Sequence, residues 1–245
     1  MPGHDVQTTW ADQIPLEQWS VYERAIAAVR TSGLPFVLGG ACALATYTGH
    51  WRNTKDLDLY VLPHDRDAII AALSRAGLTD YYDEEAYDRG WIYRAHRGEV
   101  IVDAIWAMAN YRTQVDARWL TGGPIVPIRG EALAILPAEE LIWAKLYIVH
   151  RDRCDWTDVL NLIYAAGLAL DWEHLIGRLE EDVPLLRAVL SMFSWLCPGR
   201  AQRLPGWLWR RLELAEPVGG VAPDIDRRRV ALLDSRPWFY PLSSD

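Results

Sequence analysis

Cysteine is scarce in this sequence, with three residues among 245. Cys42, Cys154 and Cys197 are widely spaced, and no Cys-x-x-Cys pair or Cys/His cluster surrounds them. A small disulfide-stabilised scaffold needs a dense, even set of cysteines, and a structural zinc site needs close pairs of ligands. The cysteine pattern therefore argues against both classes. We expect reduced thiols in a cytoplasmic protein.

The sequence also lacks a long apolar run and an excess of basic residues. No segment approaches the roughly 20 consecutive apolar residues that a membrane-spanning helix needs. Residues 1–12 contain acids and no apolar stretch, so we expect no signal peptide. The formal net charge is -8, which disfavours non-specific binding to nucleic acid. A nucleic-acid substrate held by a local basic patch is still compatible with this charge.

Apolar residues, in contrast, make up 51% of the chain. A chain of 245 residues with this composition can bury a core in one large domain or two modest ones. It contains 13 tryptophans, most of them after residue 90. Rings of this size usually fill the core of a helical region, and the alternative is that a few exposed rings stack on a base or an acceptor molecule.

One stretch organises the rest of the chain. Residues 36–41 form a short apolar strand that runs into Gly39-Gly40, and residues 54–61 form a second strand that carries Asp56 and Asp58. Because successive strand residues point to opposite faces, the two carboxylates share one face and the intervening leucines take the other. Two ionised acids side by side are costly to bury without a cation. Mg²⁺, which prefers oxygen ligands, is the natural candidate.

A third acid lies in the apolar strand of residues 99–106, where Asp103 is a poor choice for packing alone. If this strand pairs with the one that carries Asp56 and Asp58, three carboxylates converge. Three carboxylates can hold two Mg²⁺ ions that also bind a triphosphate. The Gly39-Gly40 turn would let the backbone approach that triphosphate at the start of a helix, where N–H groups favour anions.

This combination of a Gly-Gly turn, a helix, an Asp-x-Asp strand and a lone strand aspartate resembles the nucleotidyltransferase superfamily related to DNA polymerase β. The run from Arg52 to Asp58 resembles the R-x-T-x-D-L-D form of the AbiEii-like branch, in which toxin-type enzymes occur. The arrangement is also similar to the minimal and the antibiotic nucleotidyltransferases. The resemblance covers residues 34–160. Many members have Gly-Ser where this chain has Gly39-Gly40, which removes a hydroxyl that could contact phosphate.

The resemblance implies an α+β fold: a mixed β-sheet flanked by helices, followed by a helical C-terminal domain. We therefore expect a catalytic domain over residues 1–130 and a helical domain over residues 131–245. It also implies a Mg²⁺-dependent enzyme, with two ions, that uses a nucleoside triphosphate as donor, ATP being the first choice. The acceptor could be a small molecule such as an antibiotic, an RNA or a protein, and we expect no membrane partner.

Residue by residue, the resemblance assigns catalysis and metal binding to Asp56, Asp58 and Asp103. It assigns nucleotide binding to Gly39, Gly40, Thr54, Lys145 and Asp155. Family members carry a lysine on the helix after the catalytic sheet, and Lys145 matches that position. The run Arg151–Asp158 resembles the family's K-D-x-x-D element, with Cys154 where a basic residue is usual. The alternatives are a surface lysine and acids, Asp155 to Asp158, that cap the following helix.

Apolar periodicity predicts the other elements. We expect helices over residues 15–30, 41–47, 64–76, 110–119, 159–166, 172–179, 184–196 and 207–214, and a helix that begins near Pro137. Strands are predicted over residues 35–38, 78–82 and 125–128, with a hairpin of residues 91–96 and 99–106 that turns at Arg97-Gly98. Residues 1–13 are expected to be a loose leader, and the aromatic tail of residues 233–242 is expected to pack back onto the body.

Two other interpretations fit the sequence. The first is a catalytically inactive nucleotidyltransferase fold that binds nucleotide or serves as a toxin–antitoxin partner. The presence of all three acids argues against it, because an inactive site has no physical reason to hold three clustered charges. The second is a divalent-cation site in an unrelated α/β hydrolase. Such an enzyme would need further histidine or acid ligands, and only His50 lies near these motifs in the sequence.

Overall fold

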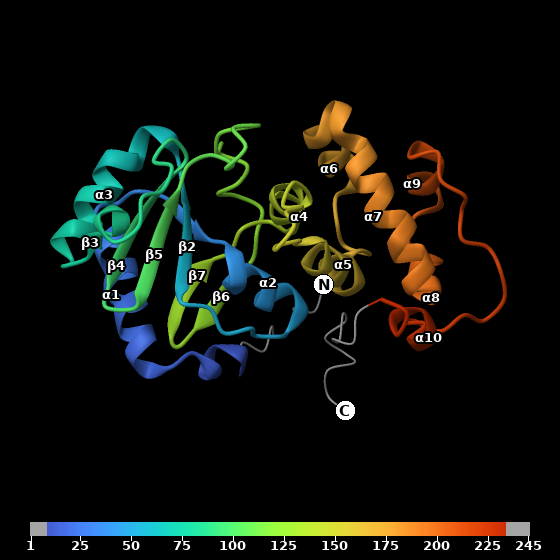
Figure 1. The fold of residues 1–245 in the computed structure, drawn as a ribbon, viewed down its shortest axis with the longest axis horizontal. Helices are drawn as coiled ribbons and strands as arrows, with labels where there is room; N and C mark the ends of the chain where they lie inside the picture. The colour runs from blue at the N-terminus through green and yellow to red at the C-terminus, as the bar shows by residue number, and fades with distance from the viewer. Residues whose placement is uncertain (1–8, 234–245) are drawn as a thin grey trace. The chain divides into compact units, whose positions relative to one another are not determined.

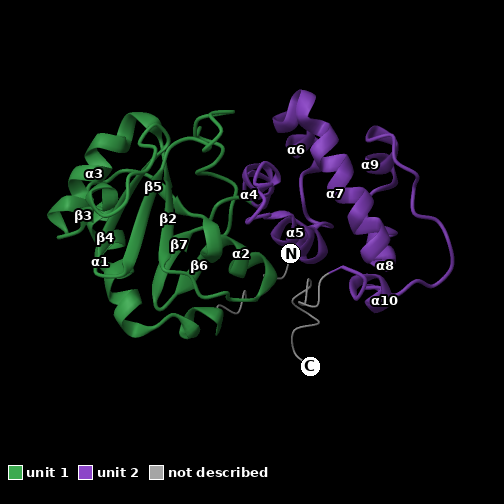
Figure 2. Ribbon diagram, viewed as in Figure 1, with its two compact units in different colours: residues 1–137 green, residues 138–245 purple. Residues whose placement is uncertain are grey.

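A computed structural model describes residues 9–233 of the chain. Most of the aromatic tail, which we expected to pack onto the body, lies outside these residues. The chain divides into two compact units, residues 1–137 and residues 138–245 (Figure 2). Each unit has its own core and is described by itself.

The first unit is built on a five-stranded mixed sheet with the strand order β1-β2-β5-β4-β3 (Figure 1). Strands β2 and β5 run parallel, and the other neighbouring pairs are antiparallel. The strands are β1 (Phe36–Leu38), β2 (Asp56–Val61), β3 (Thr79–Asp80), β4 (Ile92–Arg97) and β5 (Val100–Ile105). In β2 the predicted alternation is present, because Leu57 and Leu59 are buried whereas Asp56 and Asp58 are half-buried. The apolar face of β2 therefore faces the core.

In the described part of this unit, three α-helices and three short 3-10 helices accompany the sheet. Helices α1 and α3 pack on each other, and α1 buries Trp19, Tyr22 and Ile26 at helical spacing. Helix α2 is made of small residues and follows β1 through Gly39. The helices are α1 (Leu16–Thr31), α2 (Gly40–Thr48), α3 (Arg66–Arg75), η1 (Thr9–Gln13), η2 (Pro63–Asp65) and η3 (Tyr81–Asp83).

A separate hairpin of β6 (Ile125–Ile128) and β7 (Glu131–Ala134) also belongs to the first unit. It is joined to the main sheet region by a bridge between Leu38 and Ile135, and the Leu136 N–H donates to the Leu38 carbonyl. Residues 131–137, which we assigned to the helical domain, therefore lie in the first unit. The amino-acid composition becomes typical of helices only after this hairpin. Composition alone therefore could not show that β7 pairs with β6, the strand that precedes it in the chain.

Among the local predictions, those for residues 110–119 and for the leader were wrong. Residues 110–119, predicted as a helix, form turns and a β-bridge between Ala107 and Gln114. The carboxamide of Asn110 accepts the Arg112 N–H, and the carboxylate of Asp116 accepts the Arg118 N–H. Such short side chains compete with helical backbone bonds. The second error is the leader, because Trp10 is buried within η1.

Within the described residues, 138–233, the second unit consists of helices and the segments that join them, with one isolated β-bridge between Val149 and Cys154. Leucines from α5, α6 and α7 supply much of its core, including Leu162, Leu175 and Leu190. The helices are α4 (Ala138–Leu146), α5 (Trp156–Ala166), α6 (Trp172–Leu179), η4 (Glu180–Asp182), α7 (Val183–Leu196), α8 (Pro198–Ala201), α9 (Gly206–Arg211) and α10 (Arg227–Val230). Helix α9 ends at Arg211, three residues before the predicted end.

The mixed sheet with flanking helices, followed by a helical unit, confirms the α+β fold that we predicted. Within the described residues, no helix has both the length and the apolar character needed to cross a bilayer.

Candidate active site

The parallel pairing of β2 with β5 brings the three predicted acids together. In this register Asp58 lies directly beside Asp103, and Asp56 lies beside Ile101. Aligned residues of neighbouring parallel strands point to the same face of the sheet. Oxygen atoms of Asp56, Asp58 and Asp103 all lie within 4.8 Å of one another. The predicted convergence of the three carboxylates is therefore confirmed, while their roles stay a prediction.

A positively charged neighbour that the sequence analysis missed binds Asp103. The Arg94 Nε donates to one Asp103 oxygen at 2.9 Å, and its Nη2 donates to the other at 2.8 Å. Asp103 is buried, at 1% exposure, and Arg94 is directly opposite it in the antiparallel β4–β5 pair. Burial raises the pKa of Asp103, and the Arg94 guanidinium opposes that rise.

The position of the hairpin turn explains why this pair was missed. A turn at Arg97-Gly98 would place Arg94 opposite Ile101. The strands instead pair Arg97 with Val100, so the turn falls at Gly98-Glu99 and Arg94 faces Asp103. Both registers keep Arg94 on the same face of the sheet, because they differ by two residues. The signal that could have revealed the pair is an arginine inside a largely apolar strand, three residues before the first residue of the predicted turn.

The Gly39-Gly40 turn lies against the acids. Gly40 has a φ of +47°, a backbone conformation that favours glycine, and a Cβ added there would overlap the Asp58 carboxylate. A Cβ added at Gly39 would overlap the Tyr60 ring. The Gly39 N–H donates to the Asp58 carbonyl at 2.9 Å. The glycines therefore allow the start of α2 to lie in direct contact with the acid strand.

Thr54 lies at the other end of the acid pair. Its hydroxyl donates to an Asp56 oxygen, and its carbonyl accepts from the Gln18 carboxamide on α1. Thr54 thereby orients the Asp56 carboxylate. The structure places Gly40, Thr54 and the three acids in one neighbourhood of the first unit.

This neighbourhood suits a divalent cation such as Mg²⁺. Carboxylate oxygens are the ligands that hard cations prefer, and Asp56 and Asp58 are half-buried, so that solvent and a ligand can reach them. The start of α2, a nine-residue helix, lies beside them. Helix N-termini carry unsatisfied N–H groups and a partial positive charge that favour phosphate.

Lys145 and Asp155, the other predicted nucleotide ligands, lie together in the second unit. The Lys145 Nζ is 2.6 Å from an oxygen of Asp155 and 2.8 Å from an oxygen of Asp158. All three residues are buried, which excludes the surface alternative for Lys145. Asp155 is the residue before α5, yet its side chain makes no capping hydrogen bond. Its carboxylate binds Lys145 and Arg153 instead.

The charges around Asp155 have a net effect on its acidity. Burial raises the pKa of Asp155. Hydrogen bonds and positive charge from Arg153 and Lys145 lower the pKa by more than burial raises it, so the pKa lies below its usual value. Asp155 is therefore ionised in its ordinary state and balances the ammonium of Lys145.

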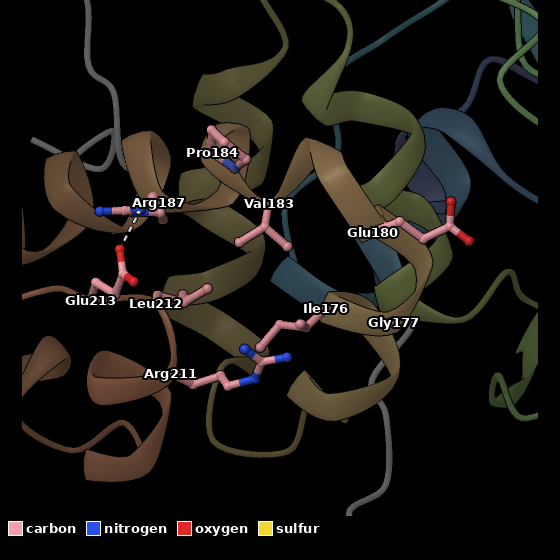
Figure 3. A pocket seen from close by; sticks show the side chains of 9 residues that line it. All are labelled: Ile176, Gly177, Glu180, Val183, Pro184, Arg187, Arg211, Leu212 and Glu213. Carbon is pink, nitrogen blue, oxygen red and sulfur yellow. Dashed lines mark hydrogen bonds and ion pairs between the residues drawn. The ribbon is translucent and has the colours of Figure 1, made fainter.

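A cavity of about 450 Å³ also lies in the second unit, between α6, α7 and the end of α9 (Figure 3). Apolar side chains such as Ile176 and Val183 line it together with Arg187 and Arg211. Arg187 is paired with Glu213 at 3.0 Å. No residue predicted as part of the site lines this cavity, so it adds nothing to the assignment of the acids.

Comparison with known proteins gave similar solved structures, although neither a family model nor a curated protein matches the chain. One is the antibiotic-resistance factor ANT(2'')-Ia, at 19% identity over 72% of this chain and 96% of that chain, with a TM-score of 0.49. Another is the lincosamide antibiotic adenylyltransferase LnuA, at 14% identity over 61% and 96%, with a TM-score of 0.43. JHP933 from Helicobacter pylori follows, at 16% identity over 73% and 79%, with a TM-score of 0.38.

At these identities and TM-scores the likeness identifies neither substrate nor mechanism for this chain. We therefore base the functional proposal on the acids, the glycines and their geometry.

Proposed function

We propose that the protein is a Mg²⁺-dependent nucleotidyltransferase that transfers a nucleoside monophosphate from a nucleoside triphosphate to a hydroxyl of an acceptor. The convergence of Asp56, Asp58 and Asp103 within 4.8 Å, against the glycine start of α2, carries this proposal. Three acids in one place are costly unless a cation binds them. A phosphate-binding helix start beside a cation site is the combination that a triphosphate requires.

In this proposal Asp56 and Asp58 hold the divalent cation, with ATP as the first donor to test. A bound Mg²⁺ would neutralise phosphate charge and align the reacting oxygens. Gly39 and Gly40 let the N–H groups of α2 approach the triphosphate, because no Cβ intervenes. Thr54 holds the Asp56 carboxylate in place through its hydroxyl. Asp103 either completes a second cation site or accepts the proton of the acceptor hydroxyl.

The reaction balances simply. The acceptor oxygen forms a bond to the α-phosphorus, and the bond from that phosphorus to the β-phosphate oxygen breaks. Pyrophosphate leaves with the electron pair, and the hydroxyl proton goes to a base and then to solvent. Stabilising charge as it moves between these oxygens is the main task of the site.

Lys145 and Asp155 remain proposals for the nucleotide, based on the sequence resemblance. The Lys145 ammonium has three N–H donors, of which Asp155 and Asp158 use two. A separate measurement tests this assignment. If it is correct, Lys145→Ala protein that is still folded should bind the triphosphate more weakly than wild type.

The acceptor class is open among a small hydroxylated molecule, an RNA and a protein. The net charge of -8 favours a small cationic acceptor over RNA, whereas the likeness to the AbiEii-like branch favours a toxin-type modifier of RNA or protein. The alternative function is an inactive nucleotide-binding or toxin–antitoxin module. The intact set of three acids favours the enzyme.

Calorimetric titration with ATP, GTP, CTP and UTP, with and without Mg²⁺, tests the proposal. We expect metal-dependent binding of one triphosphate by wild type and loss of binding in Asp56→Ala/Asp58→Ala protein. Asp67→Asn is the matched control, because it removes an exposed carboxylate of the same unit outside the cluster. The labelled nucleotide that binds is then used to screen acceptors for transfer and pyrophosphate release. Binding without transfer to any acceptor would favour the inactive module.

A further inference from the structure

Asp103 differs from the other two acids in how it is held. Both of its oxygens accept N–H groups of Arg94, at 2.9 Å and 2.8 Å, and its side chain is 2% exposed. Asp56 and Asp58 are half-buried, and Asp56 accepts the neutral hydroxyl of Thr54. Figure 1 shows the three strands that carry these groups, β4, β5 and β2, next to one another in the sheet.

The two-point contact makes Asp103 a poor competitor for a metal ion. An arginine guanidinium stays charged, and its fork matches the two carboxylate oxygens. The guanidinium uses one lone pair of each Asp103 oxygen and places a positive charge beside them. A cation that approached Asp103 would therefore meet a weaker ligand and the repulsion of Arg94.

We infer that Arg94 is a positioning residue that holds Asp103 for the acceptor hydroxyl and keeps it from binding the divalent cation, which Asp56 and Asp58 hold. This inference rests on the proposed function and decides between the two roles left open there for Asp103.

Mn²⁺ binding, followed by electron paramagnetic resonance on the triphosphate-free protein, tests whether Asp56 and Asp58 bind the cation and Asp103 does not. We expect one tightly bound ion per wild-type chain. Asp58→Asn should weaken binding more than about tenfold, because it removes a ligand. Asp103→Asn should change it less than about threefold. An equal loss in Asp58→Asn and Asp103→Asn protein would show that Asp103 is a ligand and would overturn the inference.

Replacing Arg94 separates positioning from a purely structural role. Arg94→Gln removes a positive charge near the acids and releases Asp103, so Mn²⁺ affinity should rise about tenfold. The kcat for transfer should fall about 100-fold, since misplacing a reacting group costs this much, with little change in the KM for the triphosphate. Arg97→Gln, on the same strand but exposed, is the control and should leave both quantities unchanged. Unchanged or weaker Mn²⁺ binding in Arg94→Gln protein would contradict the inference.

Two further variants distinguish a loss of positioning from a loss of folding stability. Arg94→Lys keeps the charge but cannot bind both oxygens, so Mn²⁺ affinity should stay near wild type while kcat falls. Arg94→Gln/Asp103→Asn removes the buried pair together and should restore thermal stability without restoring kcat. Full activity in Arg94→Lys protein would overturn the positioning role. Failure of the proposed function looks different, because wild type itself would then neither bind a triphosphate nor transfer it.

Discussion

Two charge clusters, one in each unit, differ in how their charges are balanced. In the second unit Lys145 lies between Asp155 and Asp158, and Arg153 also binds Asp155, so two cations meet two anions. In the first unit three carboxylates meet the guanidinium of Arg94, which binds only Asp103 in the two-point contact. The second cluster, in which Lys145 binds both carboxylates, is the balanced cluster, whereas the first gathers three carboxylates within 4.8 Å of one another.

From this difference we expect the first cluster to depend more on a bound cation than the second does. A balanced buried network stabilises the fold once its partners are present, and breaking it by removing one partner is costly. An unbalanced cluster of acids destabilises the protein until a cation binds. In the proposed function the aspartates of the first unit hold a cation, whereas Asp155 already balances the ammonium of Lys145 before any nucleotide binds.

The largest expected effect is on transfer activity. Asp58→Ala should lower kcat more than about 1000-fold, because several kcal/mol of metal-dependent stabilisation are lost. The variant should remain folded, because Asp58 is half-buried and its side chain is not part of the apolar core. Steady-state transfer and thermal unfolding of the same preparation check both statements. Full activity in folded Asp58→Ala protein would remove the basis for the proposed function.

The balanced cluster should respond in the opposite way. Lys145→Met should reduce the free energy of unfolding by about 3–5 kcal/mol, because two buried carboxylates lose their shared cation. Lys55→Met is the matched control, since Lys55 is the chain's other lysine and its ammonium is exposed. Chemical denaturation measures both variants. Equal stability of the two would mean that the Lys145 contacts contribute nothing to the fold.

A third test concerns the glycine contact with the acids. Gly40→Ala should cost about 1–3 kcal/mol of stability, because alanine is strained at a φ of +47°. It should also lower transfer about 100-fold, since the new Cβ displaces the Asp58 carboxylate. Gly49→Ala is the control: its φ is +73° but a Cβ there meets open space. Gly49→Ala should lower stability and leave transfer activity unchanged. Denaturation and activity assays on both variants measure the two effects separately.

The smallest effect concerns pH. The lowered pKa of Asp155 means that its stabilising contribution is present above its unfolded pKa, about 3.9, and is lost as pH falls through the lower folded value. As pH falls from about 5 to about 3, the melting temperature of wild type should therefore fall by more than that of Asp155→Asn protein. Asp152→Asn, an exposed neighbour, should follow wild type. A parallel decline of all three proteins would contradict the assigned cause.

Local patterns were sufficient for much of the fold and for the acids. Alternation in residues 56–61 predicted which face of β2 carries Asp56 and Asp58, because strand geometry has a period of two. Apolar periodicity predicted α6, over Trp172–Leu179, at the bounds that the structure has. These features depend on residues that are close together in the sequence, so the sequence alone predicts them.

Local patterns did not predict which distant segments of the chain pair with each other. The asparagine and aspartate turns within residues 110–119 overrode a helical pattern, and the strand β7 joined the first unit through Leu38. Both outcomes depend on which backbone groups find partners across the fold. No periodicity within one segment encodes that choice.

The sequence by itself determined that Asp56 and Asp58 share one face of a strand and that Gly39-Gly40 precedes a helix, and from the residue types it predicted cation and phosphate chemistry. Only the tertiary structure decided that Asp103 is bound at both oxygens by Arg94 and that Lys145 is balanced by Asp155 and Asp158. A shift of two residues in the β4–β5 register would have placed Arg94 opposite Ile101 instead. Charge balance depends on distances between side chains, and the folded register determines those distances.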